Sequence, residues 1–207
     1  MVDDKSVKNT EQRILDAAIK VFCRDGIQGA RMQDIADLAN INRAMLHYYY
    51  RDRESLSHKA IEATTKKMGE KIHRRIEANL SFDEKLDGYI QEQLNVYSEN
   101  TELIIFALHE SMKDSDFLGK MYRHSIDDMT FFKEMREEVK KGRIKPFKER
   151  EFLIFITSIC AYPFIASTVY KMIFGWTEEQ WNPFLEQYKK RLPGLIKQAI
   201  YTENRKQ

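Results

Sequence analysis

The stretch from Arg31 to Leu56, RMQDIADLANINRAMLHYYYRDRESL, decides the fold of this 207-residue chain. Its first part repeats apolar residues three and four positions apart, which places side chains on one face of a helix. These residues are Met32, Ile35, Ala36 and Ala39. Asn40 then interrupts the pattern. Because Asn tolerates the left-handed backbone conformation better than most non-glycine residues, Asn40 predicts a tight turn after the first helix.

A second short helix is expected directly after this turn. Ile41 is predicted to be the buried side chain that anchors the turn, and Asn42 is predicted to cap the amino end of the helix. The spacing leaves alternatives open for the inward contacts, which are Met45 or Leu46 first and then Tyr49 or Tyr50.

The outward face of the second helix predicts DNA reading. It carries hydrogen-bond donors, a small residue and flat rings, on Arg43, Ala44, His47 and Tyr48. A helix with such a face, placed after a tight turn, is what reading of the major groove requires. Two short amphipathic helices also form ordinary structural hairpins, so the pattern alone leaves both interpretations open.

The neighbouring helices supply support and phosphate contacts. A first helix is expected to end at Gly26 and to bury the back of the two reading helices. Arg31 or Gln33, near the amino end of the next helix, can reach a phosphate, because free N–H groups there favour an anion. For either residue alone, a solvated side chain is the alternative. Asp52 is expected to cap a long fourth helix that continues to about Ile76.

The composition describes a soluble globular chain, with 43% hydrophobic and 32% charged residues. Its net charge of +2 is too small to indicate nucleic-acid binding by itself. Residues 1–77 hold 15 Lys and Arg against 12 Asp and Glu, an excess of only three. A polyanion would therefore be met by individually placed contacts and not by a basic tail.

The cysteines and the hydropathy pattern indicate a cytoplasmic protein. Cys23 and Cys160 lie far apart on apolar stretches without a CxxC motif, which predicts buried free thiols over redox or metal roles. No secretory leader is evident, and the longest apolar run, around Phe152 to Phe164, is too short to span a bilayer.

Two runs of the sequence resemble a known family. INRAMLHYYYRDRESL, residues 41–56, is similar to the recognition-helix signature of the TetR family of transcriptional regulators, and EQRILDAAIKVFCRDGIQGARMQDIADLANI, residues 11–41, resembles the helices before it. The resemblance is close over the first 60 residues, and beyond them it covers only length and helical character. The chain departs from the family at Asn40, where Gly is usual, and at Arg31, His47 and Tyr50, where a small hydroxyl residue, Tyr and Phe are usual.

The resemblance implies an all-α protein with a helix-turn-helix DNA-binding domain over residues 1–53 and a helical ligand-binding and dimerisation domain over residues 54–207. It also implies a ligand-responsive regulator, expected to be a repressor, in which a basic residue at Arg53 contacts the DNA backbone. From the pattern and the resemblance together, the candidate DNA contacts are Arg31, Gln33, Asn42, Arg43, Ala44, Met45, His47, Tyr48, Tyr49 and Arg53.

The stretch from Glu149 to Phe174 predicts a homodimer. It is apolar over more than one helix face, so it must be buried on two sides. One side can meet its own domain, and a second copy of the chain is the simplest partner for the other. With the last long helix it would form a four-helix bundle and place two reading heads about 34–36 Å apart on a palindromic operator. Pro163 is expected to kink or divide the stretch, and the last helix could be interrupted at Pro193.

The middle helices contain candidate contacts for a small apolar or amphipathic ligand. Their aromatic, methionine and polar side chains are typical of a ligand pocket, although core packing is the alternative for each. These candidates are Phe106, His109, Phe131, Phe155, Tyr162 and Met172. By resemblance, a bound ligand would act through the fourth helix to change the distance between the two heads.

Neither an enzyme nor a cofactor is expected. The histidines, including His124, have no metal-binding spacing, and the chain lacks a Gly-rich phosphate loop and a nucleophile elbow. The alternative function is a helical ligand-binding or interaction protein without sequence-specific DNA binding. The retained outward donors of the second helix favour the regulator over that alternative.

Overall fold

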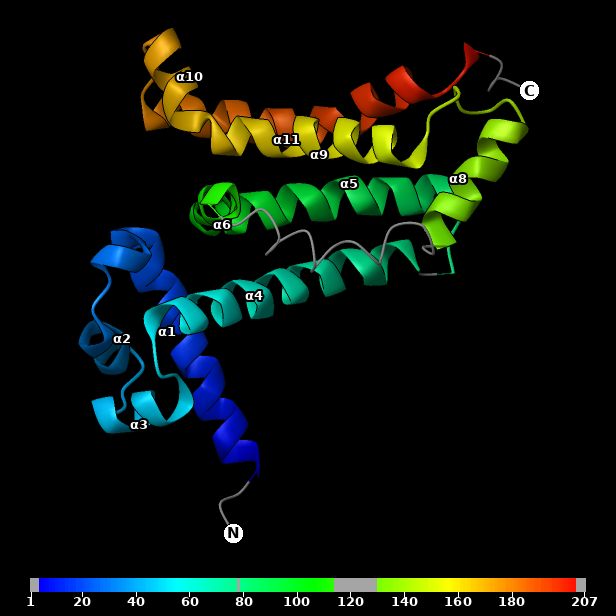
Figure 1. Cartoon of the computed structure of the whole chain (residues 1–207). Helices are drawn as coiled ribbons and strands as arrows, with labels where there is room; N and C mark the ends of the chain where they lie inside the picture. Colours follow the sequence, from blue (N-terminus) through cyan, green and yellow to red (C-terminus); the bar gives the residue numbers. More distant parts are fainter. Residues whose placement is uncertain (1–3, 78, 114–129, 204–207) are drawn as a thin grey trace. The chain divides into compact units, whose positions relative to one another are not determined.

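A computed structural model describes residues 4–77, 79–113 and 130–203. Within these residues it confirms the all-α class, since the only strand-like pairing is one isolated bridge between Ile144 and Tyr201. The helices follow in chain order in Figure 1 as α1 (Asp4–Gly29), α2 (Met32–Leu38), α3 (Arg43–Tyr49), α4 (Arg53–Ile76), α5 (Phe82–Glu99), α6 (Thr101–Lys113), α8 (Thr130–Lys140), α9 (Glu149–Ile165), α10 (Ser167–Phe174) and α11 (Glu178–Ile200).

The chain forms two compact units, and each has its own core. Of the described residues, unit 1 takes in 4–68 and 102–113, and unit 2 takes in 69–77, 79–101 and 130–203. Helix α4 therefore contributes its first part to unit 1 and its last part to unit 2. The functional boundary between residues 53 and 54 stays a prediction.

Unit 1 is built around the apolar face of α1. Ile14, Ala18 and Phe22 are fully buried there, together with Leu46 of α3. The ring of Phe22 lies parallel to that of Phe106 from α6, with centroids 6.2 Å apart. Thus α6, which is distant in sequence, completes the core that supports the two short helices.

The ends of the helices confirm several predictions from the sequence. Asn40 has a φ of 53°, the left-handed conformation expected for the turn. Gly26, with a φ of 68°, breaks the helical geometry near the end of α1. Asp52 Oδ1 accepts the backbone N–H of Ser55 at 2.7 Å and so caps the start of α4. Asn40 and Gly26 adopt a positive φ, which most residues adopt poorly, and Asp52 supplies a hydrogen-bond acceptor for a free N–H at the start of α4.

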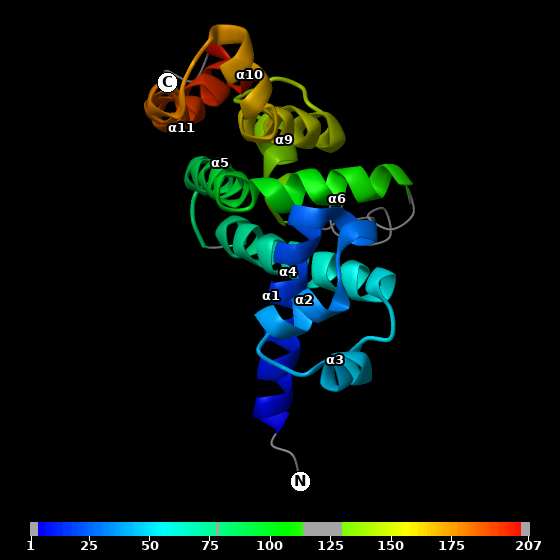
Figure 2. The same ribbon diagram turned by 90° about the vertical axis from the view of Figure 1, so that its left-hand side faces the viewer.

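Unit 2 packs α5 against α8, α9 and α11. Figures 1 and 2 show α9 and α11 side by side, with α5 covering one side of this pair. The buried core contains Leu86, Ile90 and Leu94 of α5 among the larger set Phe131, Phe132, Met135, Phe152, Ile156, Cys160, Phe164, Leu192, Ile196 and Ile200. Helix α5 therefore satisfies one apolar face of the α9 and α11 pair.

The two prolines at which the sequence predicts a break, Pro163 and Pro193, have different outcomes. As expected at Pro163, the apolar stretch divides: α9 ends at Ile165, and α10 continues at an angle of 62° to it. At Pro193 the helix is not interrupted, because α11 runs through to Ile200. Leu192 beside Pro193 is buried in the unit 2 core, which holds that turn in place.

No single described helix is both long and apolar enough to cross a membrane, and α9 with α10 reaches that length and composition only as a bent pair. Both cysteines are free thiols, as predicted. Cys160 is buried in the unit 2 core, and Cys23 is half-buried in unit 1.

Both thiols should react slowly in the folded protein, although only Cys160 is buried as predicted. Burial raises the pKa of Cys160 to about 12 and that of Cys23 to about 11, so both stay protonated at pH 8. We expect Cys160 to react with an aromatic disulfide reagent at least 100 times more slowly in the native protein than in urea. Equal rates in the two conditions, followed by absorbance of the released thiolate, would contradict its burial.

Candidate DNA interface

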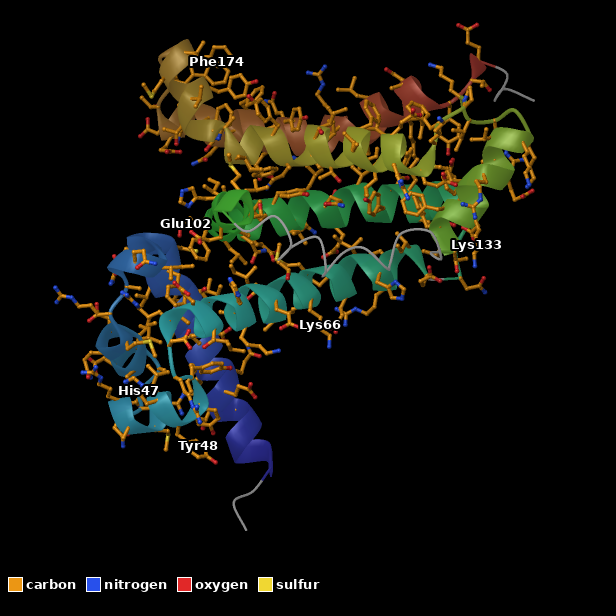
Figure 3. All side chains as sticks on the ribbon, in the orientation of Figure 1. His47, Tyr48, Lys66, Glu102, Lys133 and Phe174 are labelled. Atoms are coloured by element: carbon orange, nitrogen blue, oxygen red, sulfur yellow. The ribbon has the colours of Figure 1, made fainter. Side chains whose placement is uncertain are left out.

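The structure settles which side of α3 faces outward. Leu46 is fully buried and Tyr50 is 8% exposed, so these two residues make the inward contacts that the sequence left open. Met45 is 43% exposed, and Tyr49 is half-buried. Arg43, Ala44, His47 and Tyr48 are all exposed, as predicted for the reading face. Figure 3 shows His47 and Tyr48 on the outer side of α3.

The amino end of α3 is capped by Asn42. Its Oδ1 accepts the backbone N–H of Met45 at 2.7 Å, which confirms the predicted N-cap. Because this oxygen is committed to the cap, only the amide NH₂ of Asn42 remains as a donor toward a base or phosphate. On the same helix, Arg43 Nε donates to His47 Nε2 at 3.4 Å. This contact holds two of the candidate reading side chains side by side.

Arg13 of α1 holds the turn between α2 and α3, a role that the sequence did not reveal. Its guanidinium Nη2 donates to the backbone carbonyls of Ala39 and Asn40, the latter at 2.9 Å. The N–H of Ile41 donates to the carbonyl of Ala36 at 3.0 Å and closes the turn. A cation at the carboxyl end of α2 also matches the sign of the helix dipole. Local patterns miss Arg13 because it lies 26 residues before the turn.

Tyr50 fixes the other end of α3. Its hydroxyl donates to Glu11 Oε1 of α1 at 3.2 Å. Burial, reinforced by the Glu11 carboxylate, raises the pKa of Tyr50 well above its usual range, so the phenol remains a hydrogen-bond donor. Helix α1 therefore holds the reading helix through Arg13 before it and Tyr50 after it.

Arg53 lies at the junction of three helices. Its Nη1 donates to the carbonyls of Gln28 and Ala30, at 2.8 and 3.1 Å, and the residue is half-buried. Arg53 thus ties the start of α4 to the link between α1 and α2. A guanidinium has five N–H donors, so these bonds do not exhaust its capacity for a phosphate. The DNA-backbone contact of Arg53 stays a prediction alongside this structural role.

The two candidates at the start of α2 are exposed. Arg31 occupies the N-cap position without a side-chain cap, and Gln33 Nε2 donates to Asp37 Oδ1 at 2.7 Å. Together with the exposed side of α3 they belong to unit 1, so the structure places all ten candidate DNA contacts within one compact unit. Their contacts with DNA stay predictions.

The structure does not gather the six candidate ligand contacts around one cavity. Phe106 and His109 belong to unit 1, where Phe106 packs on Phe22 and His109 is exposed, 3.3 Å from Glu110. Phe131, Phe155, Tyr162 and Met172 belong to unit 2. Sequence spacing could not separate core packing from pocket lining for these residues.

The four candidates in unit 2 also have different surroundings. Phe131 is buried in the core, and Phe155 stacks on Phe147 with ring centroids 6.0 Å apart. Met172 is 78% exposed on α10. Tyr162 lines an apolar hollow of about 430 Å³, formed by Ser158, Ile159, Tyr162, Pro163, Tyr170, Phe174, Trp181, Phe184 and Tyr188. The predicted role of all six in ligand binding remains untested.

No group of three or more His, Cys, Asp or Glu in the described part of the chain is arranged to hold a metal ion. His124 lies outside the described residues.

The comparisons with known proteins agree with this geometry. Residues 14–60 match the model of the family described as bacterial regulatory proteins, tetR family. The uncharacterised HTH-type transcriptional regulator YhgD of Bacillus subtilis is 25% identical over 88% of this chain and 90% of its own length. IcaR of Staphylococcus epidermidis, described as a biofilm operon HTH-type negative transcriptional regulator, is 24% identical over 90% of this chain and 99% of its own length.

A solved structure shares the fold over most of its length. The putative transcriptional regulator SCO4942 from Streptomyces coelicolor aligns with a TM-score of 0.70 at 19% identity, covering 92% of this chain and 98% of that one. The family match over the helix-turn-helix and these relatives show a DNA-binding transcriptional regulator, and the described residues are all-α. The chain belongs to the TetR family of bacterial regulatory proteins.

The contact between Arg13 and the Asn40 turn should be measurable as stability. We expect Arg13→Ala to lower the free energy of unfolding by about 1 kcal/mol, the usual contribution of an intramolecular hydrogen bond. In an Asn40→Gly background the loss should be smaller, because glycine adopts a positive φ without strain. Urea unfolding of the wild type, Arg13→Ala, Asn40→Gly and the double variant measures this coupling.

Arg24→Ala is the matched control. Arg24 also lies on α1, but its partners are the surface carboxylates of Asp25 and Asp34. Exposed ion pairs of this kind contribute about 0–1 kcal/mol. Equal losses for Arg13→Ala and Arg24→Ala would show that the turn does not depend on Arg13.

Proposed function

We propose that this TetR-family regulator binds a palindromic operator as a homodimer, acts as a repressor and is released by a small-molecule ligand. The observation that carries the proposal is the exposed face of α3. A capped helix, held at both ends by α1, presents Arg43, His47 and Tyr48 to solvent. Side chains of these types on a helix that is held in place favour base reading over non-specific attraction.

The roles of the individual residues follow from their chemistry. Arg43 would contact bases, because a guanidinium matches the two acceptors on guanine in the major groove. Tyr48 and Tyr49 would contact a phosphate or a thymine methyl group, and their rings already meet edge to face with centroids 5.6 Å apart. Arg53 and Arg31 would contact the DNA backbone, which positions the head without reading sequence.

The homodimer is supported by the second face of α9 and α11. α5 covers one face of this pair, while Ile154 of α9 is 66% exposed and Leu195 of α11 is 46% exposed. Exposed apolar side chains of this size, gathered on two neighbouring helices, are typical of a protein interface. A second copy that packs there would complete a four-helix bundle and bring two α3 helices to one duplex.

Repression is supported by the description of a relative, and ligand release by the resemblance to the family. IcaR is described as a negative regulator, and a solved structure from Clostridium perfringens with a TM-score of 0.67 is described as a putative fatty acid metabolism regulator. Helix α4 contributes to both units, so it offers a path by which a ligand in unit 2 could act on the head. A cytoplasmic location is part of this proposal.

Selection of bound sequences from a random duplex pool tests the proposal. At about 150 mM salt, which suppresses non-specific attraction, we expect enrichment of a palindrome. A folded protein that enriches no sequence would instead favour the alternative, a helical ligand-binding or interaction protein without sequence-specific DNA binding.

Substitutions at Arg43 and Arg53 separate reading from positioning. On the selected operator, Arg43→Ala should relax the preference at one base pair and cost about 1–3 kcal/mol there. Arg53→Ala should weaken binding to all duplexes alike and reduce the salt dependence. Because Arg53 also donates hydrogen bonds to the carbonyls of Gln28 and Ala30, the Arg53→Ala substitution should lower the melting temperature as well. Identical binding profiles for the two variants would refute this division of roles.

A further inference from the structure

Arg43 and His47 lie four positions apart on α3, so they share its outward face. Both side chains are exposed, and Arg43 Nε donates to His47 Nε2 at 3.4 Å. A side chain on a helix leans toward the amino end, so the imidazole ring lies over the turn that carries Arg43. The long, flexible side chain of Arg43 is thus restrained by the shorter side chain of His47.

The contact fixes the chemical form of His47. A neutral imidazole carries one N–H and one acceptor nitrogen, so a ring that accepts at Nε2 has its proton on Nδ1. Such a ring is uncharged. A carboxylate at this position would also accept from Arg43, but it would cancel the positive charge that attracts a polyanion. The imidazole of His47 instead orients the guanidinium and leaves its charge in place.

The remaining donors of Arg43 point to a ligand outside the chain. A guanidinium has five N–H groups, and Nε holds only one of them. The other four lie on Nη1 and Nη2, which make no ion pair or further hydrogen bond within the described residues. In the same unit, Arg13 and Arg53 donate to backbone carbonyls, and Arg24 pairs with a carboxylate. Arg43 differs from these three because its Nη end is not bound within the described chain.

The geometry of this end determines which base it fits. With Nε engaged, Arg43 presents Nη1 and Nη2 as two neighbouring donors at the tip of the side chain. Guanine has two neighbouring acceptors, N7 and O6, in the major groove, whereas adenine has one acceptor beside a donor. Ala44 follows Arg43 and is exposed, and its methyl group leaves room for the approach of a base edge. The pair of Arg43 and His47 therefore favours guanine.

We propose that His47 is a positioning residue for base reading, which holds Arg43 Nε so that Nη1 and Nη2 meet N7 and O6 of one guanine in each half-site. The inference rests on the proposed operator binding, and it adds the base that is read and the residue that sets this preference. His47 acts through Arg43. The neighbouring ring of Tyr48 packs edge to face on Tyr49 and belongs to a separate contact.

Two substitutions at His47 test the proposal against each other. His47→Ala removes the acceptor, whereas His47→Gln keeps one, because the amide oxygen of Gln lies about as far along the side chain as Nε2 of His. The guanine in question is the one whose preference is lost in Arg43→Ala. The measurement compares binding to the selected operator with binding to a duplex in which this G·C pair is A·T in both half-sites. It is made at about pH 8, where histidine is ordinarily neutral.

We expect the wild type to prefer the guanine operator about tenfold or more, His47→Ala to keep less than about a third of that ratio, and His47→Gln to keep more than about half. Binding to a duplex without the operator should change less than about twofold in either variant, because neither substitution removes a positive charge. Since His47 is exposed, thermal unfolding should show both variants folded. A ratio that His47→Ala leaves unchanged, or that His47→Gln does not restore, would overturn the proposal.

A double variant separates positioning from direct reading. In an Arg43→Ala background, His47→Ala should leave the remaining base preferences unchanged, because the group that it positions is absent. A further loss of preference in that background would show that His47 reads a base itself. An equal loss of affinity for operator and unrelated duplexes in the single variant would show that His47 contacts the DNA backbone. Either result would overturn the positioning role.

The outcomes also distinguish this inference from the proposed function. A selected palindrome with no guanine that depends on Arg43 would overturn the inference and leave operator binding intact. The same holds for a palindrome whose guanine preference survives His47→Ala. A folded wild type that enriches no sequence would overturn both the inference and the proposed function.

Discussion

The left-handed turn at Asn40 is the constraint on which the reading head depends. It reverses the chain within the four residues between α2 and α3, so it sets the direction in which α3 begins. The family usually has glycine there, which adopts this conformation without strain, whereas an asparagine must be held in it. Arg13 supplies that restraint from α1 by binding the carbonyls of Ala39 and Asn40. The geometry of the proposed DNA contacts therefore depends partly on α1.

The second constraint lies in the α9 and α11 pair of unit 2. Helix α9 is apolar on more than one side and packs one of them against α5, while α11 adds the exposed apolar side chain of Leu195. A head with a single recognition helix makes few base contacts, so specificity for an operator requires two heads. In the proposed homodimer, the second copy would bury the exposed apolar face of unit 2 and would supply a second recognition helix for a longer DNA site.

The sequence was sufficient for features determined by local chemistry. Asn40, Asn42, Asp52 and Pro163 each impose a backbone conformation or satisfy a nearby N–H, so their effects were predictable from neighbours within a few residues. Contacts between distant residues were not predictable in this way. The roles of Arg13 and Arg53 in binding backbone carbonyls depend on how α1 crosses the head. Likewise, an aromatic side chain at helical spacing gives the same pattern in a core and in a pocket. Phe131 is in the core, and Tyr162 lines the hollow.

The most direct test of the account is the dependence of operator affinity on half-site spacing. Inserting about five base pairs, half a helical turn, between the half-sites of the selected palindrome would place the second major groove on the opposite side of the duplex. The affinity of a dimer with two rigid reading heads should then fall at least 100-fold. On the original site, two chains should bind each duplex. Unchanged affinity, or one chain per duplex on the original site, would contradict the dimeric reading of a palindrome.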